Sequence, residues 1–122
     1  MNEIKDALMG KTIVAFDLDI EGERLILQLE DAPPVKLATY GDCCSHTWIE
    51  SIDAPAALLG TVQDVEDIEM PDLGNIDGTR YQDVEVVRYY GLKITTNKGH
   101  VVIDYRNDSN GYYGGSLGLG HL

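Results

Sequence analysis

The feature of this sequence that most restricts its fold is an apolar pattern that repeats every second residue. Apolar side chains occupy alternate positions in residues 25–29, where three leucines do so, and again in residues 101–105. Because successive side chains of a strand point to opposite faces, each segment would present one apolar face. The sequence therefore predicts a domain built mainly from half-buried antiparallel strands.

The N-terminal third predicts a short helix followed by a meander of strands. Residues 3–9 predict a helix that ends at Gly10, since glycine readily adopts the left-handed conformation that closes helices. Strands are expected over residues 12–18, 25–29 and 35–40. The first turn is expected at Ile20–Glu23, and Asp31–Pro34, with its two prolines, is expected to separate the second and third strands.

The middle of the chain is less regular. Between Gly41 and Pro55 the alternation is lost, and Ser45 or Thr47 is a suitable N-cap for a short helix that runs to Ile52. In that helix Trp48 would anchor the segment in the core. Residues 58–70 fit an irregular strand as well as a helix, and we favour the strand; residues 71–79 are rich in Asp, Gly and Asn and predict a loop.

The C-terminal part predicts hairpins. Residues 84–96 are β-branched and aromatic, with a bulge expected at Gly91. Asn97–Gly99 predicts a tight turn, residues 100–105 the returning strand, and the chain from Tyr112 a last strand after an Asn110-Gly111 turn. The prediction is one α+β domain over residues 1–122, mainly antiparallel β-sheet with an N-terminal meander, C-terminal hairpins and one or two short helices.

Charge narrows the classes of partner. The chain has 21 acidic and nine basic residues, a net charge of −12, which argues against DNA, RNA or an anionic membrane as a partner. No apolar run approaches the roughly 18 residues that cross a bilayer, and the N-terminus lacks the pattern of a signal peptide. We therefore expect a cytoplasmic protein. An anion site would need a local basic island, and the basic candidates from residue 80 onward lie among aromatic residues.

The richest candidate for a binding site is the segment Tyr105–Gly115. It combines a guanidinium, side-chain amides, adjacent phenols and glycines. Aromatic faces can stack on a base, arginine pairs with phosphate, and glycine lets backbone amides approach a ligand. A hairpin with edge aromatics is the simpler alternative, but the combination favours binding of a small polar ligand. The candidate ligand-binding residues are Arg106, Asn107, Ser109, Asn110, Tyr112 and Tyr113, together with Arg80, Arg88 and Tyr89.

A metal or catalytic centre has weaker support. Cys43, Cys44 and His46 lie close in sequence, but structural zinc takes a second pair of ligands, and the only other histidines are His100 and His121. A disulfide between the adjacent cysteines would be strained. A thiol nucleophile activated by His46 stays an alternative, next to the simpler interpretation of two small buried side chains. We expect no metal, no cofactor and no catalytic residue.

Two segments carry a family resemblance. Tyr40-Gly41-Asp42-Cys43-Cys44-Ser45-His46-Thr47-Trp48-Ile49-Glu50 resembles the signature of a family of small phage and prophage proteins, and Arg106–Gly115 resembles its second signature. This group is similar to the Thoeris anti-defence sponges, phage proteins that sequester the cyclic ADP-ribose signal of a bacterial immune enzyme. The resemblance implies binding of a cyclic nucleotide without cleavage, in the cytoplasm of the bacterial host, in a pocket where the protomers of a homo-oligomer meet.

The resemblance also implies roles for single residues. Arg106 would pair with a phosphate, Asn107 and Asn110 would bond to sugar or base edges, and Tyr112 or Tyr113 would stack. Two alternatives come from other classes of protein. One is an acidic inhibitor that binds a host defence protein directly, and the other is an enzyme that uses a cysteine of the Cys43-Cys44 pair with His46.

Overall fold

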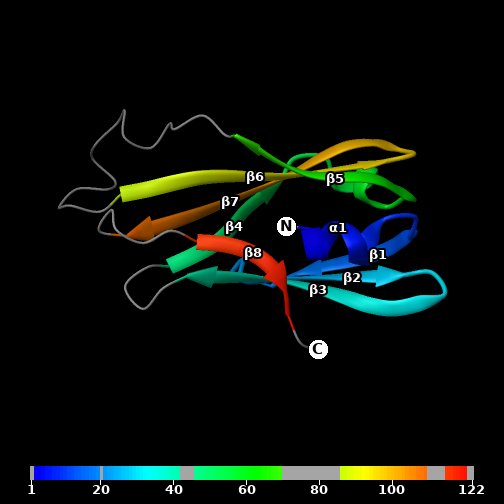
Figure 1. Ribbon diagram of the computed structural model, residues 1–122, viewed down its shortest axis with the longest axis horizontal. Helices are drawn as coiled ribbons and strands as arrows, with labels where there is room; N and C mark the ends of the chain where they lie inside the picture. Colours follow the sequence, from blue (N-terminus) through cyan, green and yellow to red (C-terminus); the bar gives the residue numbers. More distant parts are fainter. Residues whose placement is uncertain (1, 20, 42–45, 70–85, 110–114, 121–122) are drawn as a thin grey trace.

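Two four-stranded antiparallel sheets stack on each other in the computed structural model, which describes residues 2–19, 21–41, 46–69, 86–109 and 115–120 (Figure 1). The strand order is β1-β2-β3-β8 in the first sheet and β4-β7-β6-β5 in the second. The predicted fold class, mainly antiparallel sheet with two short helices, is confirmed. The elements are α1 (Asn2–Leu8), β1 (Ile13–Leu18), β2 (Arg24–Leu29), β3 (Ala32–Gly41), β4 (His46–Ile52), α2 (Pro55–Leu58), β5 (Val62–Glu69), β6 (Val86–Thr96), β7 (Gly99–Ser109) and β8 (Gly115–Leu119).

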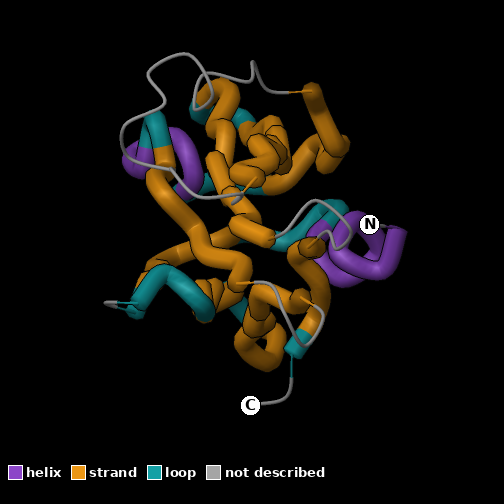
Figure 2. Tube along the Cα trace, turned by 90° about the vertical axis from the view of Figure 1, so that its left-hand side faces the viewer, coloured by secondary structure: helices purple, strands orange, loops and turns teal. Residues whose placement is uncertain are grey.

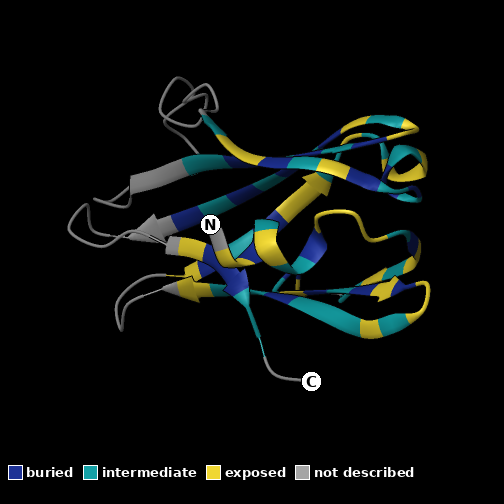
Figure 3. Ribbon diagram, turned by 45° about the vertical axis from the view of Figure 1, so that its right-hand side comes forward, coloured by how far each residue is buried: buried dark blue, intermediate teal, exposed yellow. Residues whose placement is uncertain are grey.

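The core lies between the sheets. Buried positions alternate with more exposed ones along the strands, as the period-two pattern predicts (Figure 3). Leu27 of the first sheet and Ile103 of the second are completely buried. Helix α1 lies at one side of the sandwich (Figure 2), where it contacts β3, β5 and β8 and buries Ile4 and Leu8. Within the described ranges, no helix combines the length and the hydropathy needed to cross a bilayer.

The third strand begins earlier than predicted. Pro33 and Pro34 lie inside β3, so the prediction that they separate two strands is wrong. The ladder between β2 and β3 shifts register here, with Val35 opposite Leu27 but Ala32 opposite Leu29. The prolines therefore occupy the irregular part of the ladder, where a missing N–H group is tolerated.

The helix predicted up to Ile52 is also wrong, because His46–Ile52 forms strand β4. The β4–β7 register shifts between Ile49 and Ser51, so Glu50 is an extra residue in a β-bulge. This bulge interrupts the alternation by which a strand is recognised in a sequence. Trp48 is half-buried and alternates with the buried Thr47 and Ile49, so it faces away from the core that it was expected to anchor.

The second sheet otherwise follows the predicted hairpins. Residues 62–69 of the ambiguous segment form β5, and the turn at Asn97–Lys98 joins β6 to β7. No bulge occurs at Gly91, since the β6–β7 ladder runs from Val86 to Thr96 without a shift. Strand β7 extends beyond Tyr105 to Ser109. The predicted loop at 71–79 and the predicted strand start at Tyr112 lie outside the described residues.

The turn between β1 and β2 joins the two sheets at Gly22. The Ile49 N–H of β4 donates to the Gly22 carbonyl oxygen at 2.5 Å. Gly22 has a φ of +71°, a conformation that glycine adopts without steric cost. A Cβ at this position would overlap the carbonyl oxygen of Ile49. Asp19 fixes the turn by accepting hydrogen bonds from the N–H groups of Glu23 and Arg24.

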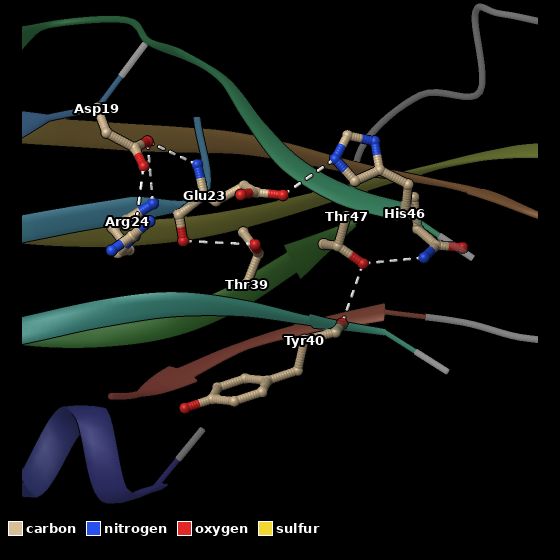
Figure 4. A network of polar contacts seen from close by, with 8 residues as sticks. Asp19, Glu23, Arg24, Thr39, Tyr40, His46 and Thr47 are labelled. Carbon is tan, nitrogen blue, oxygen red and sulfur yellow. Dashed lines mark hydrogen bonds and ion pairs between the residues drawn. The ribbon is translucent and has the colours of Figure 1, made fainter. Parts of the chain in front are cut away.

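A buried chain of hydrogen bonds forms a second link between the sheets. Thr47 Oγ1 of β4 donates to the Tyr40 carbonyl oxygen of β3 at 3.0 Å and accepts from Asn107 Nδ2 of β7 at 2.9 Å (Figure 4). Thr47 is 4% exposed and Asn107 is completely buried. Buried polar groups require partners, so this chain fixes the relative positions of β3, β4 and β7.

We expect Gly22→Ala to lower the free energy of unfolding by at least about 3 kcal/mol, because it combines an unfavourable backbone conformation with a clash against β4. Gly10→Ala is the matched control, since Gly10 has a φ of +77° with no atom within 4 Å of the added Cβ. It should cost about 1–2 kcal/mol. Urea denaturation measures the free energy of unfolding of both variants. Equal losses of this free energy would show that the clash with Ile49 adds nothing to the effect of the backbone conformation.

Thr47→Val should lower the free energy of unfolding by about 1–3 kcal/mol, because it leaves the buried amide of Asn107 without its partner. Ser51→Ala, at an exposed position of the same strand, should change it by less than about 0.5 kcal/mol. Denaturant titration followed by circular dichroism provides the measurement. A Thr47→Val variant as stable as the wild type would contradict a stabilising role for these buried hydrogen bonds.

Candidate functional site

The described parts of the two signature segments lie next to each other at one end of the molecule. In the first sheet, β3 and β8 pair Gly41 with Gly115. In the second, β4 and β7 pair Trp48 with Arg106. Strand β6 begins at the same end, since Val86 is opposite Ser109, the last residue of β7 (Figure 1). The fold therefore brings together segments that are far apart in the sequence.

Three side chains form a row across the solvent-facing side of the second sheet. Arg106 is opposite Trp48 on one neighbouring strand and opposite Tyr89 on the other. Directly opposed residues in antiparallel strands share a face, so Arg106 lies between two aromatic residues. The guanidinium carbon of Arg106 is 4.7 Å from the centre of the Tyr89 ring, which is a cation–π contact. On the other side, the rings of His46 and Trp48 stack with centres 5.4 Å apart.

Two carboxylates contact the guanidinium of Arg106. Asp104 accepts from Nε at 3.3 Å and from Nη2 at 3.1 Å, and Glu50 lies 3.8 Å from Nη1. Glu50 also accepts a 3.0 Å hydrogen bond from Trp48 Nε1. Burial by itself disfavours the charged guanidinium, but the hydrogen bond and charge of Asp104, with Glu50, raise the pKa of Arg106. We call Trp48, Glu50, Tyr89, Asp104 and Arg106 the outer cluster.

Asn107 does not belong to this surface. It follows Arg106 in β7, so its side chain points to the opposite face, where it is completely buried. Its Nδ2 donates to Thr47, and its Oδ1 has no hydrogen-bond partner among the described residues. Arg88 is opposite Asn107 in the β6–β7 ladder, whereas Tyr89 is opposite Arg106. The structure thus separates Arg106 from Asn107, which the sequence had placed around one ligand.

The inner face of the sheet is closely packed at this end. Tyr105 is 6% exposed, and its ring stacks on that of Tyr90 with centres 5.1 Å apart. Burial raises the pKa of Tyr105 to about 12, with smaller contributions from Asp67 and Tyr90. Among the described residues at this end, the solvent-facing side of the sheet is therefore the one that a ligand can reach.

The remaining predicted residues are placed as follows. Ser109 ends β7 and is opposite Val86. His46 Nε2 lies 3.2 Å from Glu23 Oε2 (Figure 4). In the part of the chain that the structure describes, no group of three or more His, Cys, Asp or Glu side chains is arranged to hold a metal ion. Outside the described residues lie Arg80, Asn110, Tyr112, Tyr113, Cys43 and Cys44.

Sequence reasoning missed three members of the outer cluster. Trp48 and Glu50 were assigned to a helix, and the bulge at Glu50 explains that error. Asp104 could have been found by extending the strand predicted over residues 100–105 by one residue, because positions two apart in a strand lie on the same face.

Comparison with known proteins identifies a family. The family model described as Domain of unknown function (DUF7448) matches residues 6–119. No curated protein and no solved structure gives a significant match. The matched range includes both sheets and the whole outer cluster. The chain therefore belongs to the DUF7448 family.

Proposed function

We propose that this protein binds a compact nucleotide signal of the cyclic ADP-ribose type and holds it without cleaving it. The observation that carries the proposal is the row formed by Trp48, Arg106 and Tyr89, in which two aromatic residues flank an arginine on the outer face of the sheet. Aromatic rings and guanidinium planes stack on bases, and arginine pairs with phosphates. One row thus offers both kinds of contact that a nucleotide uses.

The position of the row supports the same proposal. Arg106 lies near the end of β7, and Asn110, Tyr112 and Tyr113, which the resemblance assigns to the ligand, follow that strand in the sequence. Trp48 and Glu50 belong to the other signature segment. Residues from both signatures therefore contribute to one surface, as a shared binding role would require.

A sponge must bind its ligand with high affinity, and this requirement favours a homo-oligomer. Nanomolar affinity corresponds to about 12 kcal/mol, and one surface arginine contact supplies only a small part of it. The Arg106 side chain is 20% exposed on a strand face, so a second protomer that covers the row would exclude water from the bound nucleotide. In this proposal the protein acts in the cytoplasm of a phage-infected bacterium, where it removes an immune signal.

The direct test is uptake and release of the nucleotide. We expect the protein to deplete a cyclic ADP-ribose isomer from solution, as measured by chromatography of the filtrate, and to release it unchanged on heating. Recovery of a cleaved product would identify an enzyme instead. A salt-sensitive complex with a bacterial protein, indifferent to nucleotides, would identify the acidic inhibitor.

The contribution of Arg106 can be measured in the same assay. We expect Arg106→Ala to weaken uptake by about 10-fold or more, because a charge-assisted hydrogen bond to phosphate is lost. Arg106→Lys should lie between this variant and the wild type, since it keeps the charge but not the paired donors. Arg24→Ala removes an arginine that pairs with Asp19 in the other sheet, and it should bind normally. Full uptake by a folded Arg106→Ala protein would refute the role.

A further inference from the structure

The two carboxylates of the outer cluster contact different sides of the guanidinium. Arginine has five N–H donors. Asp104 accepts from Nε and Nη2, which leaves the two N–H groups of Nη1 and one of Nη2 on the other side. Glu50 approaches this other side, with its Oε1 3.8 Å from Nη1. A phosphate could pair with Nη1 and Nη2 while Asp104 stays in place.

Asp104 holds Arg106 in position. It makes two hydrogen bonds from the same strand, and its side chain is 16% exposed, so solvent screens the pair only in part. Tyr89 adds the cation–π contact on the ring face. These contacts restrict the rotamers of a long side chain before any ligand arrives, which lowers the entropy cost of binding.

Glu50 is held less firmly. Its side chain is 38% exposed, it comes from the bulge of the edge strand β4, and its distance to Nη1 exceeds that of a hydrogen bond. An exposed pair of this kind contributes little to stability. Glu50 also accepts from Trp48 Nε1, so its displacement would release an indole N–H next to Arg106.

From this geometry, and resting on the proposed function, we propose that Asp104 and Glu50 have opposite effects on ligand binding. Asp104 is a positioning residue that presents Arg106. Glu50 occupies the place of the ligand's anionic group and must be displaced by it. The ligand that fits is one with a densely charged pyrophosphate, which competes with a carboxylate for arginine, while a neutral nucleoside leaves Glu50 in place.

The experiment uses the only tryptophan of the chain, Trp48, as a fluorescent reporter within the cluster. Wild-type protein, Asp104→Asn and Glu50→Gln are titrated with inorganic pyrophosphate, adenosine and cyclic ADP-ribose. Phosphorus NMR of pyrophosphate reports binding independently of the indole. For pyrophosphate we expect Asp104→Asn to weaken binding about 10-fold and Glu50→Gln to strengthen it about 3- to 10-fold, with no response of the wild type to adenosine.

Glu66→Gln is the control for net charge, because Glu66 lies on β5, two strands from β7 in the same sheet, and pairs with Lys93 at 3.6 Å. It should leave the affinity unchanged. The inference would be overturned if the Asp104 and Glu50 variants changed the affinity for pyrophosphate in the same direction. It would also be overturned if the wild type did not bind pyrophosphate at millimolar concentration. If the opposite shifts occur but cyclic ADP-ribose binds no tighter than pyrophosphate, the inference holds and the proposed function fails.

Discussion

The pairing of β4 with β7 is the interaction on which the rest of the structure depends. It places Trp48 beside Arg106 on the outer face and Thr47 beside Asn107 on the inner face. The inner pair then bonds to the Tyr40 carbonyl oxygen and joins the sheets. Since side chains alternate along a strand, a shift of one residue would exchange the two faces. The buried hydrogen bonds therefore determine which residues remain available to a ligand.

Electrostatics impose the second constraint. In a chain with a net charge of −12, an anion site has to be local, and Arg106 lies between two carboxylates. Asp104 and Glu50 pair with the guanidinium, so in the proposed function they would also compete with an incoming phosphate. In the proposed function, such a site would favour ligands with concentrated negative charge over weaker anions. It also explains how a strongly acidic protein could bind a nucleotide without a broad attraction to nucleic acid.

Much of the fold followed from local patterns. The alternation in 25–29 and 101–105 and the short N-terminal helix are encoded by neighbouring residues and are confirmed, although the helix ends at Leu8, before the left-handed Gly10. The turn predicted at Asn97–Gly99 is confirmed at Asn97–Lys98, and Gly99 already belongs to β7. The errors occurred where the local pattern is broken. The bulge at Glu50 removed the alternation of β4, and the prolines of β3 were compatible with a strand only because the ladder is irregular there.

The same distinction between local pattern and tertiary structure holds for the candidate site. The sequence by itself determined that Arg106 lies in a segment rich in aromatic and amide side chains, and that the domain is mainly antiparallel sheet. Only the tertiary structure decided that Trp48 and Tyr89 flank Arg106, that Asp104 and Glu50 contact it, and that Asn107 is buried behind it. The physical reason is that residue type and period are local properties. The register between distant strands is instead set by how the whole core packs and by which buried polar groups find partners.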